Sequence, residues 1–142
     1  MTNNRGISDG MKKLAILDAN YNRAREGLRV AEDVERFYYH SVKYSKLRRL
    51  RHRLTDIFRE DYEKFVKNRN VKEDRGATLK ERASGGMKDV LRKNISRVAE
   101  ALRVLEEVAK TERGGKAAAV KRIRFRLYEI EKDFLTGEKK TV

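Results

Sequence analysis

The chain has 142 residues with no proline or cysteine, and its 36 Lys and Arg residues outnumber its 22 Asp and Glu residues, giving a formal net charge of +14. This length suits a single domain over residues 1–142, and the lack of cysteine excludes a disulfide scaffold, a catalytic thiolate and cysteine metal ligands. No stretch is apolar enough for a signal peptide or a membrane span, so we expect a soluble, cytoplasmic protein with no membrane partner.

The charge has two possible origins. The positive excess indicates an anionic partner. A surface rich in Lys, Arg and Glu is also typical of heat-adapted proteins, which stabilise themselves with networks of ion pairs. The sequence leaves open whether the excess is functional or reflects a thermophile-like composition.

The sequence predicts an all-α fold, because no segment alternates with a period of two and helix-forming residues dominate. The polar residues 1–10 are expected to be frayed. The polar connection at 67–86 is too long for an ordinary turn and is a candidate functional loop. In chain order, helices are expected at about 16–38, 44–66, 86–111 and 115–136, with boundaries uncertain by about two to four residues.

The first and third expected helices contain nearly the same segment, NRAREGLRVAED at 22–33 and SRVAEALRVLEE at 96–107. Matching residues are separated by a constant 74 positions, beginning with Asn20 and Asn94 (94 − 20). The apolar positions of the second and fourth helices recur at an offset of 73. Each hairpin has one apolar face, so we expect two duplicated hairpins to pack together as a four-helix bundle with pseudo-twofold symmetry.

Helical periodicity places Asn20 in the apolar face of the first helix and Arg23 at its border, and Asn94 and Arg97 repeat this arrangement. A buried amide without a hydrogen bond costs on the order of several kcal/mol. In one interpretation the asparagines bond each other or the preceding backbone, and the arginine stems cover the core edge. In the other, these side chains surround a cavity in which amides bind a heterocycle and guanidiniums bind phosphate.

Common catalytic motifs are missing. The sequence has no Walker-type phosphate loop, no dinucleotide-binding glycine motif and no metal-spaced His or Cys cluster. With only His40 and His52, a Ser–His–Asp triad is disfavoured. His52 is flanked by arginines and is matched in the repeat by Phe125, so it marks a position where the two halves differ.

Several segments closely resemble a bacterial helical domain that is usually fused ahead of thiamine phosphate synthase and is identified as a hydroxymethylpyrimidine phosphate kinase. The resemblance covers nearly the whole chain. Because the sequence includes no synthase domain, we expect the domain to act as a stand-alone chain. The matching segments are DANYNRAREGLRVAEDVER at 18–36, LRHRL at 50–54, a D-x-G loop at Asp74 and Gly76, and RKNISRVAEALRVLEEVAK at 92–110.

The resemblance implies ATP-dependent phosphorylation of hydroxymethylpyrimidine phosphate to its diphosphate in thiamine biosynthesis, with ATP and Mg²⁺ as cofactors. Such a transfer depends mainly on positioning and positive charge. The sequence does not identify the catalytic residue. By their chemistry, the candidates within the matching motifs are Arg23, Arg25, Arg53 and Arg97 for phosphate, Asn20, Asn22, Asn94 and His52 for the pyrimidine substrate, and Asp18, Glu32 and Asp74 for the metal.

Two other functions remain open. The chain could be a non-catalytic helical partner of thiamine phosphate synthase. The arginine-rich segment YSKLRRLRHRL at 44–54 also allows nucleic-acid binding, although acidic residues are mixed through most helices and aromatics do not interleave with the basic residues. The oligomeric state is also open, because a homo-oligomer that completes the cavity would have the same sequence pattern.

Overall fold

The computed structural model describes residues 7–70 and 82–137. Within these residues the chain forms five α-helices, one π-helical turn and no β-strand, so the prediction of an all-α fold is confirmed. The elements are α1 (Asp9–Asp33), the π-helical turn η1 (Val34–Tyr38), α2 (Tyr44–Ile57), α3 (Tyr62–Asn68), α4 (Met87–Ala109) and α5 (Lys116–Thr136).

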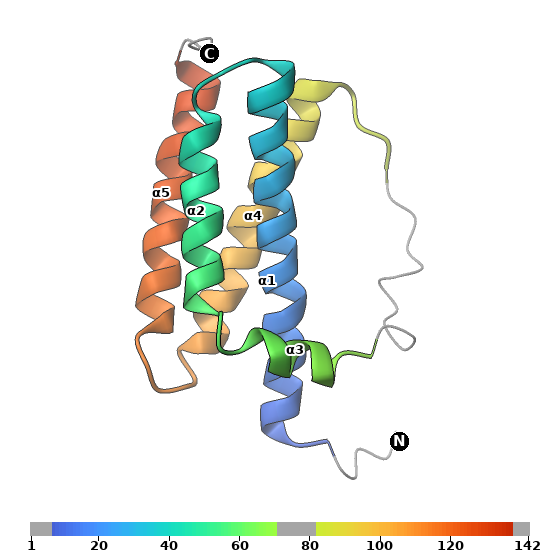
Figure 1. Ribbon diagram of the computed structural model, residues 1–142, viewed down its shortest axis with the longest axis vertical. Helices are drawn as coiled ribbons and strands as arrows, with labels where there is room; N and C mark the ends of the chain where they lie inside the picture. Colours follow the sequence, from blue (N-terminus) through green and yellow to red (C-terminus); the bar gives the residue numbers. More distant parts are fainter. Residues whose placement is uncertain (1–6, 71–81, 138–142) are drawn as a thin grey trace.

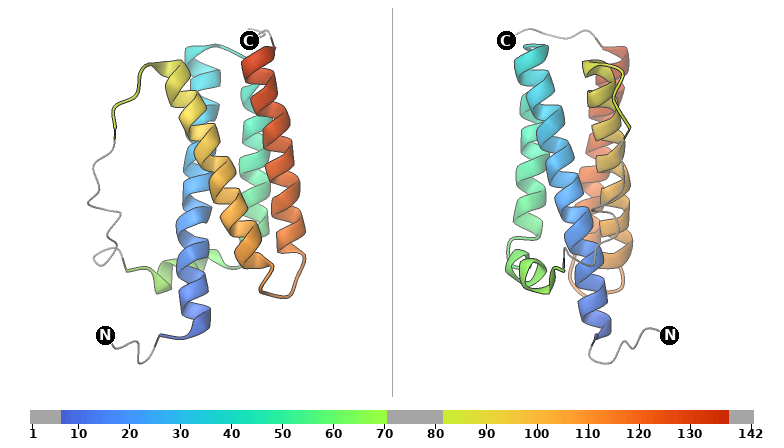
Figure 2. Two further views of the ribbon diagram at one scale, coloured as in Figure 1. Left: turned by 180° about the vertical axis from the view of Figure 1, so that it is seen from behind. Right: turned by 90° about the vertical axis from the view of Figure 1, so that its right-hand side faces the viewer.

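The four long helices lie side by side, and the short α3 lies across one end of them (Figure 1). Helix α1 packs against α2 and α4, and α5 also packs against both α2 and α4. Seen from the side, α1 and α2 form one layer and α4 and α5 the other (Figure 2). Helices α1 and α4 run in opposite directions, so equivalent residues of the sequence repeat approach each other from opposite ends.

Two helix boundaries differ from the prediction. Helix α1 begins at Asp9 because the Ser8 hydroxyl caps it, accepting a hydrogen bond from the Met11 backbone N–H at 3.1 Å. The expected single helix at 44–66 is wrong: the chain breaks between α2 and α3. The break turns α3 toward α1, where the Tyr21 ring lies 5.4 Å from that of Phe58 and 5.8 Å from that of Phe65. Burial of this aromatic cluster outweighs the local preference for a continuous helix.

The core lies between the two layers. Each long helix contributes a leucine with no exposed surface: Leu28, Leu54, Leu102 and Leu127. These residues are related by the sequence repeat, at offsets of 74 (102 − 28) and 73 (127 − 54). In the part of the chain that the structure describes, no helix is both long enough and apolar enough to cross a membrane.

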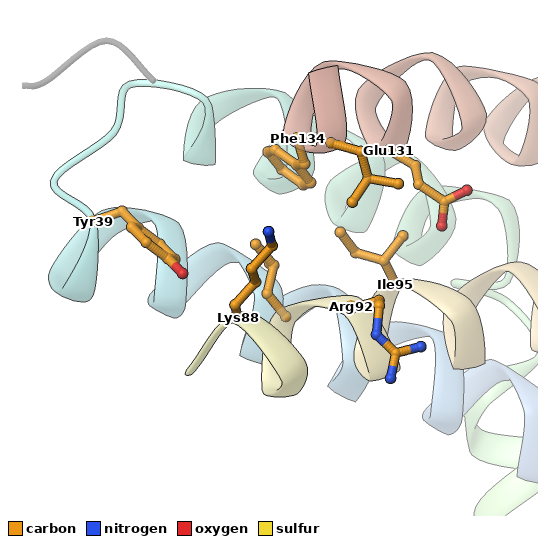
Figure 3. Close-up of a pocket in the computed structure, with 8 residues that line it drawn as sticks. Tyr39, Lys88, Arg92, Ile95, Glu131 and Phe134 are labelled. Carbon is orange, nitrogen blue, oxygen red and sulfur yellow. The ribbon is translucent and has the colours of Figure 1, made fainter. Parts of the chain in front are cut away.

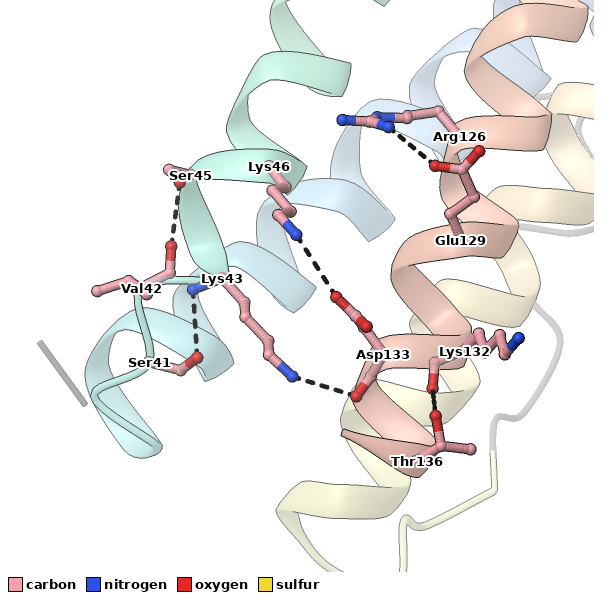
Figure 4. Close-up of polar contacts among 10 residues, drawn as sticks. All are labelled: Ser41, Val42, Lys43, Ser45, Lys46, Arg126, Glu129, Lys132, Asp133 and Thr136. Carbon is pink, nitrogen blue, oxygen red and sulfur yellow. Dashed lines mark hydrogen bonds and ion pairs between the residues drawn. The ribbon is translucent and has the colours of Figure 1, made fainter. Parts of the chain in front are cut away.

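Polar contacts join α2 and α5 at one end of the molecule (Figure 4). The Lys43 ammonium donates to the backbone carbonyl of Asp133 at 3.1 Å, and the Lys46 ammonium lies 3.4 Å from the Asp133 carboxylate. At the opposite end, Gly114 in the α4–α5 turn adopts φ 111°, a conformation that favours glycine, whereas Gly115 has φ −68°. These contacts hold α2 against α5, and the turn reverses the chain between α4 and α5.

Candidate functional site

A groove of about 630 Å³ lies between α1 and α4. Each helix supplies five lining residues, and every residue from α1 has its counterpart from α4 at an offset of 74. A groove built from the repeated segment therefore presents the same set of side chains twice. The pairs are Asn20 and Asn94, Arg23 and Arg97, Glu26 and Glu100, Gly27 and Ala101, and Val30 and Val104.

The two asparagines are held in the same way, each by its own helix. The Asn20 side-chain amide donates to the Ile16 carbonyl at 2.9 Å, and that of Asn94 donates to the Val90 carbonyl at 2.8 Å. They do not bond each other, but each makes the hydrogen bond to the preceding backbone that the first interpretation of the sequence predicted. The side-chain oxygen of each accepts no hydrogen bond from the described residues, so it is available to a ligand in the groove.

The four charged side chains of the groove have no ion-pair partner in the part of the chain that the structure describes. Among residues 7–70 and 82–137, no ion pair is formed by Arg23, Arg97, Glu26 or Glu100, and all four residues are exposed to solvent. Guanidiniums that are free of carboxylates can bind phosphate through two parallel hydrogen bonds. The groove thus combines two free cations, two free carboxylates and two amide oxygens.

Gly27 allows the close approach of α1 and α4 at the floor of the groove. A Cβ atom at this position would lie 2.6 Å from Val98 Cγ2 and 3.3 Å from the backbone oxygen of Asn94. Both distances are shorter than ordinary van der Waals contact. Any side chain here would push the helices apart or displace Val98.

In a comparison with known protein families, the model of the ThiD2 family matches residues 15–133 of this chain. The chain belongs to the ThiD2 family. It is 39% identical over 132 residues to the thiamine-phosphate synthase of Gloeobacter violaceus, a match that covers 90% of this chain and 38% of the relative. It is 37% identical over 135 residues to the thiamine-phosphate synthase of Thermosynechococcus vestitus, a match that covers 92% of this chain and 38% of the relative.

A third relative, the thiamine-phosphate synthase of Prochlorococcus marinus, is 36% identical over 128 residues, covering 87% of this chain and 36% of the relative. The chain therefore spans less than two fifths of the length of these curated relatives. No solved structure matches it. The groove described above lies within the region that the ThiD2 family model matches.

Other predicted site residues of this ThiD2-family chain lie outside the groove. The Asp18 carboxylate accepts two hydrogen bonds from Arg69, at 2.7 and 2.9 Å, and one from Asn22 at 2.7 Å. The hydrogen bond to Asp18 raises the pKa of Arg69. The Arg25 guanidinium stacks over the Tyr21 ring at 5.4 Å. This second polar cluster ties the end of α3 to α1.

Three further candidates are also separate from the groove. Glu32 pairs with Arg51 of α2 at 2.8 Å, and His52 and Arg53 are exposed on α2. Asp74 falls outside the described residues. Within those residues, no group of three or more His, Asp or Glu side chains is placed to hold a metal ion by protein ligands alone.

Sequence reasoning missed several lining residues, above all Glu26 and Glu100. The signal that identifies them is the repeat itself. Once Asn20 and Arg23 are assigned to a cavity, the next turn of the same helix face brings Glu26, and the 74-residue offset brings its counterpart. Acidic residues at i, i+3 from arginine usually indicate a solvated helix face, so the local pattern alone does not mark Glu26 and Glu100 as groove residues.

A second hollow of about 410 Å³ lies at the end of the molecule where α4 begins and α5 ends (Figure 3). It is mainly apolar, and its charged lining residues include Lys88 and Arg92. Its lining residues Ile95 and Glu131 correspond in the repeat to Tyr21 and Phe58, which pack against Phe65 of α3. In the described residues nothing equivalent to α3 follows α5.

Proposed function

We propose that this chain is an ATP-dependent kinase that converts hydroxymethylpyrimidine phosphate to its diphosphate in thiamine biosynthesis, acting in the cytoplasm, and that the α1–α4 groove binds its substrates. The naming of its relatives as thiamine-phosphate synthases supports a role in the pathway. The observation that carries the proposal is the pairing of uncommitted arginines and asparagine oxygens in one groove.

In the proposed site, Arg23 and Arg97 bind phosphate groups, and the side-chain oxygens of Asn20 and Asn94 accept hydrogen bonds from the heterocycles. The transfer itself needs little covalent chemistry from the protein, since fixed positive charge and correct positioning lower its barrier. Groove residues can supply both.

The carboxylates of Glu26 and Glu100 fit Mg²⁺, because this ion is commonly bound by one or two carboxylates together with substrate phosphates. When bound, Mg²⁺ neutralises charge on the phosphates. The carboxylates of Asp18 and Glu32 are occupied by arginines, so we assign metal binding to Glu26 and Glu100 in their place.

The same proposal includes the origin of the groove. We infer that the four long helices are a four-helix bundle made of two duplicated hairpins. Two ion pairs support this: Glu32 with Arg51 within the first hairpin and Glu106 with Arg124 within the second, both at 2.8 Å. Their members are related by offsets of 74 (106 − 32) and 73 (124 − 51).

The test is ADP release by the purified chain supplied with ATP, Mg²⁺ and hydroxymethylpyrimidine phosphate. We expect turnover, and a fall in kcat/KM of about 100-fold or more for Arg23→Ala and Arg97→Ala, because each removes a preorganised charge from the transition state. Arg29→Ala and Arg103→Ala are matched controls: these repeat-related arginines lie on the same helices but pair outward with Asp33 and Glu107. Absence of turnover, or equal losses in the control variants, would overturn the proposal.

The alternative is that the domain is a non-catalytic partner of thiamine phosphate synthase. The far greater length of the relatives favours a functional association with further domains. Turnover by the isolated chain contradicts this alternative. Loss of turnover together with binding to the purified synthase supports it.

A further inference from the structure

We propose that the groove is divided into two equivalent subsites, one at each end, which bind the adenine ring of ATP and the pyrimidine ring of the second substrate, with the phosphates meeting between them. This inference rests on the proposed kinase function and extends it. Neither the family nor the relatives' names assign such a division. Its basis is the antiparallel packing of α1 and α4 together with the repeat.

The two asparagines lie at different ends of the groove. Asn94 lies beside Gly27, since its backbone oxygen is 3.3 Å and its side-chain oxygen 3.9 Å from where a Gly27 Cβ would be. Gly27 is seven residues along α1 from Asn20, which corresponds to about 10 Å at the helical rise of 1.5 Å per residue. A single small ring therefore cannot contact both amides.

Each end has the same composition. The Asn94 end includes Gly27 and Val30 of α1, and the repeat places Ala101 and Val104 of α4 at the Asn20 end. Each end thus has an apolar valine, a small residue that leaves space and an amide oxygen that accepts a hydrogen bond. This combination suits a flat ring that bears an amino group.

The chemistry of the two proposed substrates explains why one site, used twice, is sufficient. The six-membered ring of adenine is itself an aminopyrimidine, so it presents the same kind of ring edge as the aminopyrimidine of the thiamine precursor. A duplicated hairpin supplies two copies of one ring-binding end. No separate nucleotide-binding motif is then needed, in agreement with the lack of a Walker-type loop in the sequence.

The centre of the groove contains the four charged residues Arg23, Arg97, Glu26 and Glu100. Rings bound at opposite ends direct their phosphates toward this centre. A phosphate oxygen of the pyrimidine phosphate attacks the γ-phosphorus of ATP, and the bond from that phosphorus to the β,γ-bridging oxygen breaks. The bridging oxygen keeps the electron pair and leaves as part of ADP, so the step is balanced without another reactant.

Steady-state kinetics of Asn20→Ala and Asn94→Ala test the division. We expect one variant to raise the KM for ATP about tenfold and leave the KM for the pyrimidine phosphate within twofold, and the other variant to do the reverse. About tenfold corresponds to the loss of one hydrogen bond to a ligand. If both variants raise the KM of the same substrate, or each raises both equally, the division is overturned while the kinase function stands.

A second pair of variants checks the same division by binding alone. Val104→Trp fills the Asn20 end and Val30→Trp fills the Asn94 end, and equilibrium dialysis measures binding of ADP and of hydroxymethylpyrimidine phosphate separately. Val104→Trp is expected to abolish binding of the ligand that Asn20→Ala weakens, and Val30→Trp that of the other. Val66→Trp, on the exposed face of α3, is the control, and circular dichroism verifies folding. A mismatch between the two pairs contradicts the division, whereas a wild-type chain that has no turnover contradicts the underlying kinase function.

Discussion

Arg124 of α5 and Glu106 of α4 form a buried ion pair, in which Arg124 Nε donates to Glu106 Oε2 at 2.8 Å. Their side chains are 8% and 2% exposed. The hydrogen bond to Glu106 raises the pKa of Arg124 and so favours its charged form. The pair fixes α5 against α4, and α4 forms one side of the groove.

Replacing Arg124 alone leaves the Glu106 carboxylate buried without its partner. Arg124→Met is therefore expected to lower the free energy of unfolding by about 3 kcal/mol or more, as measured by urea denaturation. The double variant Glu106→Leu with Arg124→Met removes both charges and is expected to recover most of this loss. Equal stability of the single and double variants would show that burial of the unpaired carboxylate is not the cause.

Replacing Gly27 with a residue that has even the smallest side chain is expected to destabilise the protein. Gly27→Ala places a Cβ 2.6 Å from Val98 Cγ2, and Val98 is fully buried, so we expect a loss of about 1–3 kcal/mol of stability from overpacking. Adding Val98→Ala makes space and gives these two positions the residues of their repeat counterparts, Ala101 and Ala24. The double variant is expected to be more stable than Gly27→Ala in thermal denaturation. No recovery would indicate that the Asn94 backbone, not Val98, limits the approach.

The Asp89 carboxylate is expected to make the stability of the protein depend on pH. Its carboxylate accepts a hydrogen bond from the Gly85 backbone and pairs with Arg92 and Lys93, and these contacts lower its pKa far below its ordinary value of 3.8. A lowered pKa means that the stabilisation is complete above pH 3.8 and is lost as the pH falls toward the folded-state pKa. Asp89→Asn should therefore lower the melting temperature at pH 7, and the difference from wild type should shrink below pH 3.8.

The control for this experiment is Glu63→Gln. Glu63 pairs with Lys67 at 2.9 Å on the surface of α3, with both side chains more than 70% exposed. Exposed pairs of this kind contribute little to stability. A change in the Glu63 variant as large as that in the Asp89 variant would point to a general effect of net charge.

Phe65 anchors α3 to the four long helices. It has no exposed surface, and its ring lies 5.8 Å from that of Tyr21 and 6.1 Å from that of Phe58. Phe65→Ala should cost about 3–5 kcal/mol if α3 unfolds together with the rest, because a large buried ring is lost. Val66→Ala, at a 45% exposed neighbour, is the matched control.

Hydrogen exchange distinguishes local from global unfolding in the Phe65 variant. If α3 detaches on its own, its amides will exchange faster while those of α5 stay protected, and the global loss of stability will be small. Protection of α3 equal to that in wild type would contradict the anchoring role.

Local signals explain how much of the fold could be predicted. The lack of period-two alternation and the dominance of helix-forming residues predict the all-α class. The Ser8–Asp9 pair is a readable cap, although the apolar periodicity predicts a later start of the first helix. The break between α2 and α3 has no glycine or proline to mark it. It arises from contacts of Phe58 and Phe65 with Tyr21, which are distant in sequence, so local patterns cannot predict it.

The site residues likewise separate into those that local sequence patterns identify and those that only distant contacts explain. The repeat and the helical period identified Asn20 and Asn94 as inward-facing, and the structure places both in the groove. Asp18 and Glu32 were predicted as metal ligands because they are acidic and lie in the matching motif. Their partners, Arg69 and Arg51, are 51 and 19 residues away, and no local pattern reveals such pairings.

The hollow beside Phe134 and the filled position beside Phe65 make the two ends of the described structure unlike. Between these ends, α1 and α4 present matching kinds of side chain to one groove. The likeness between the two halves of the sequence is therefore visible along the sides of these helices and not at their ends.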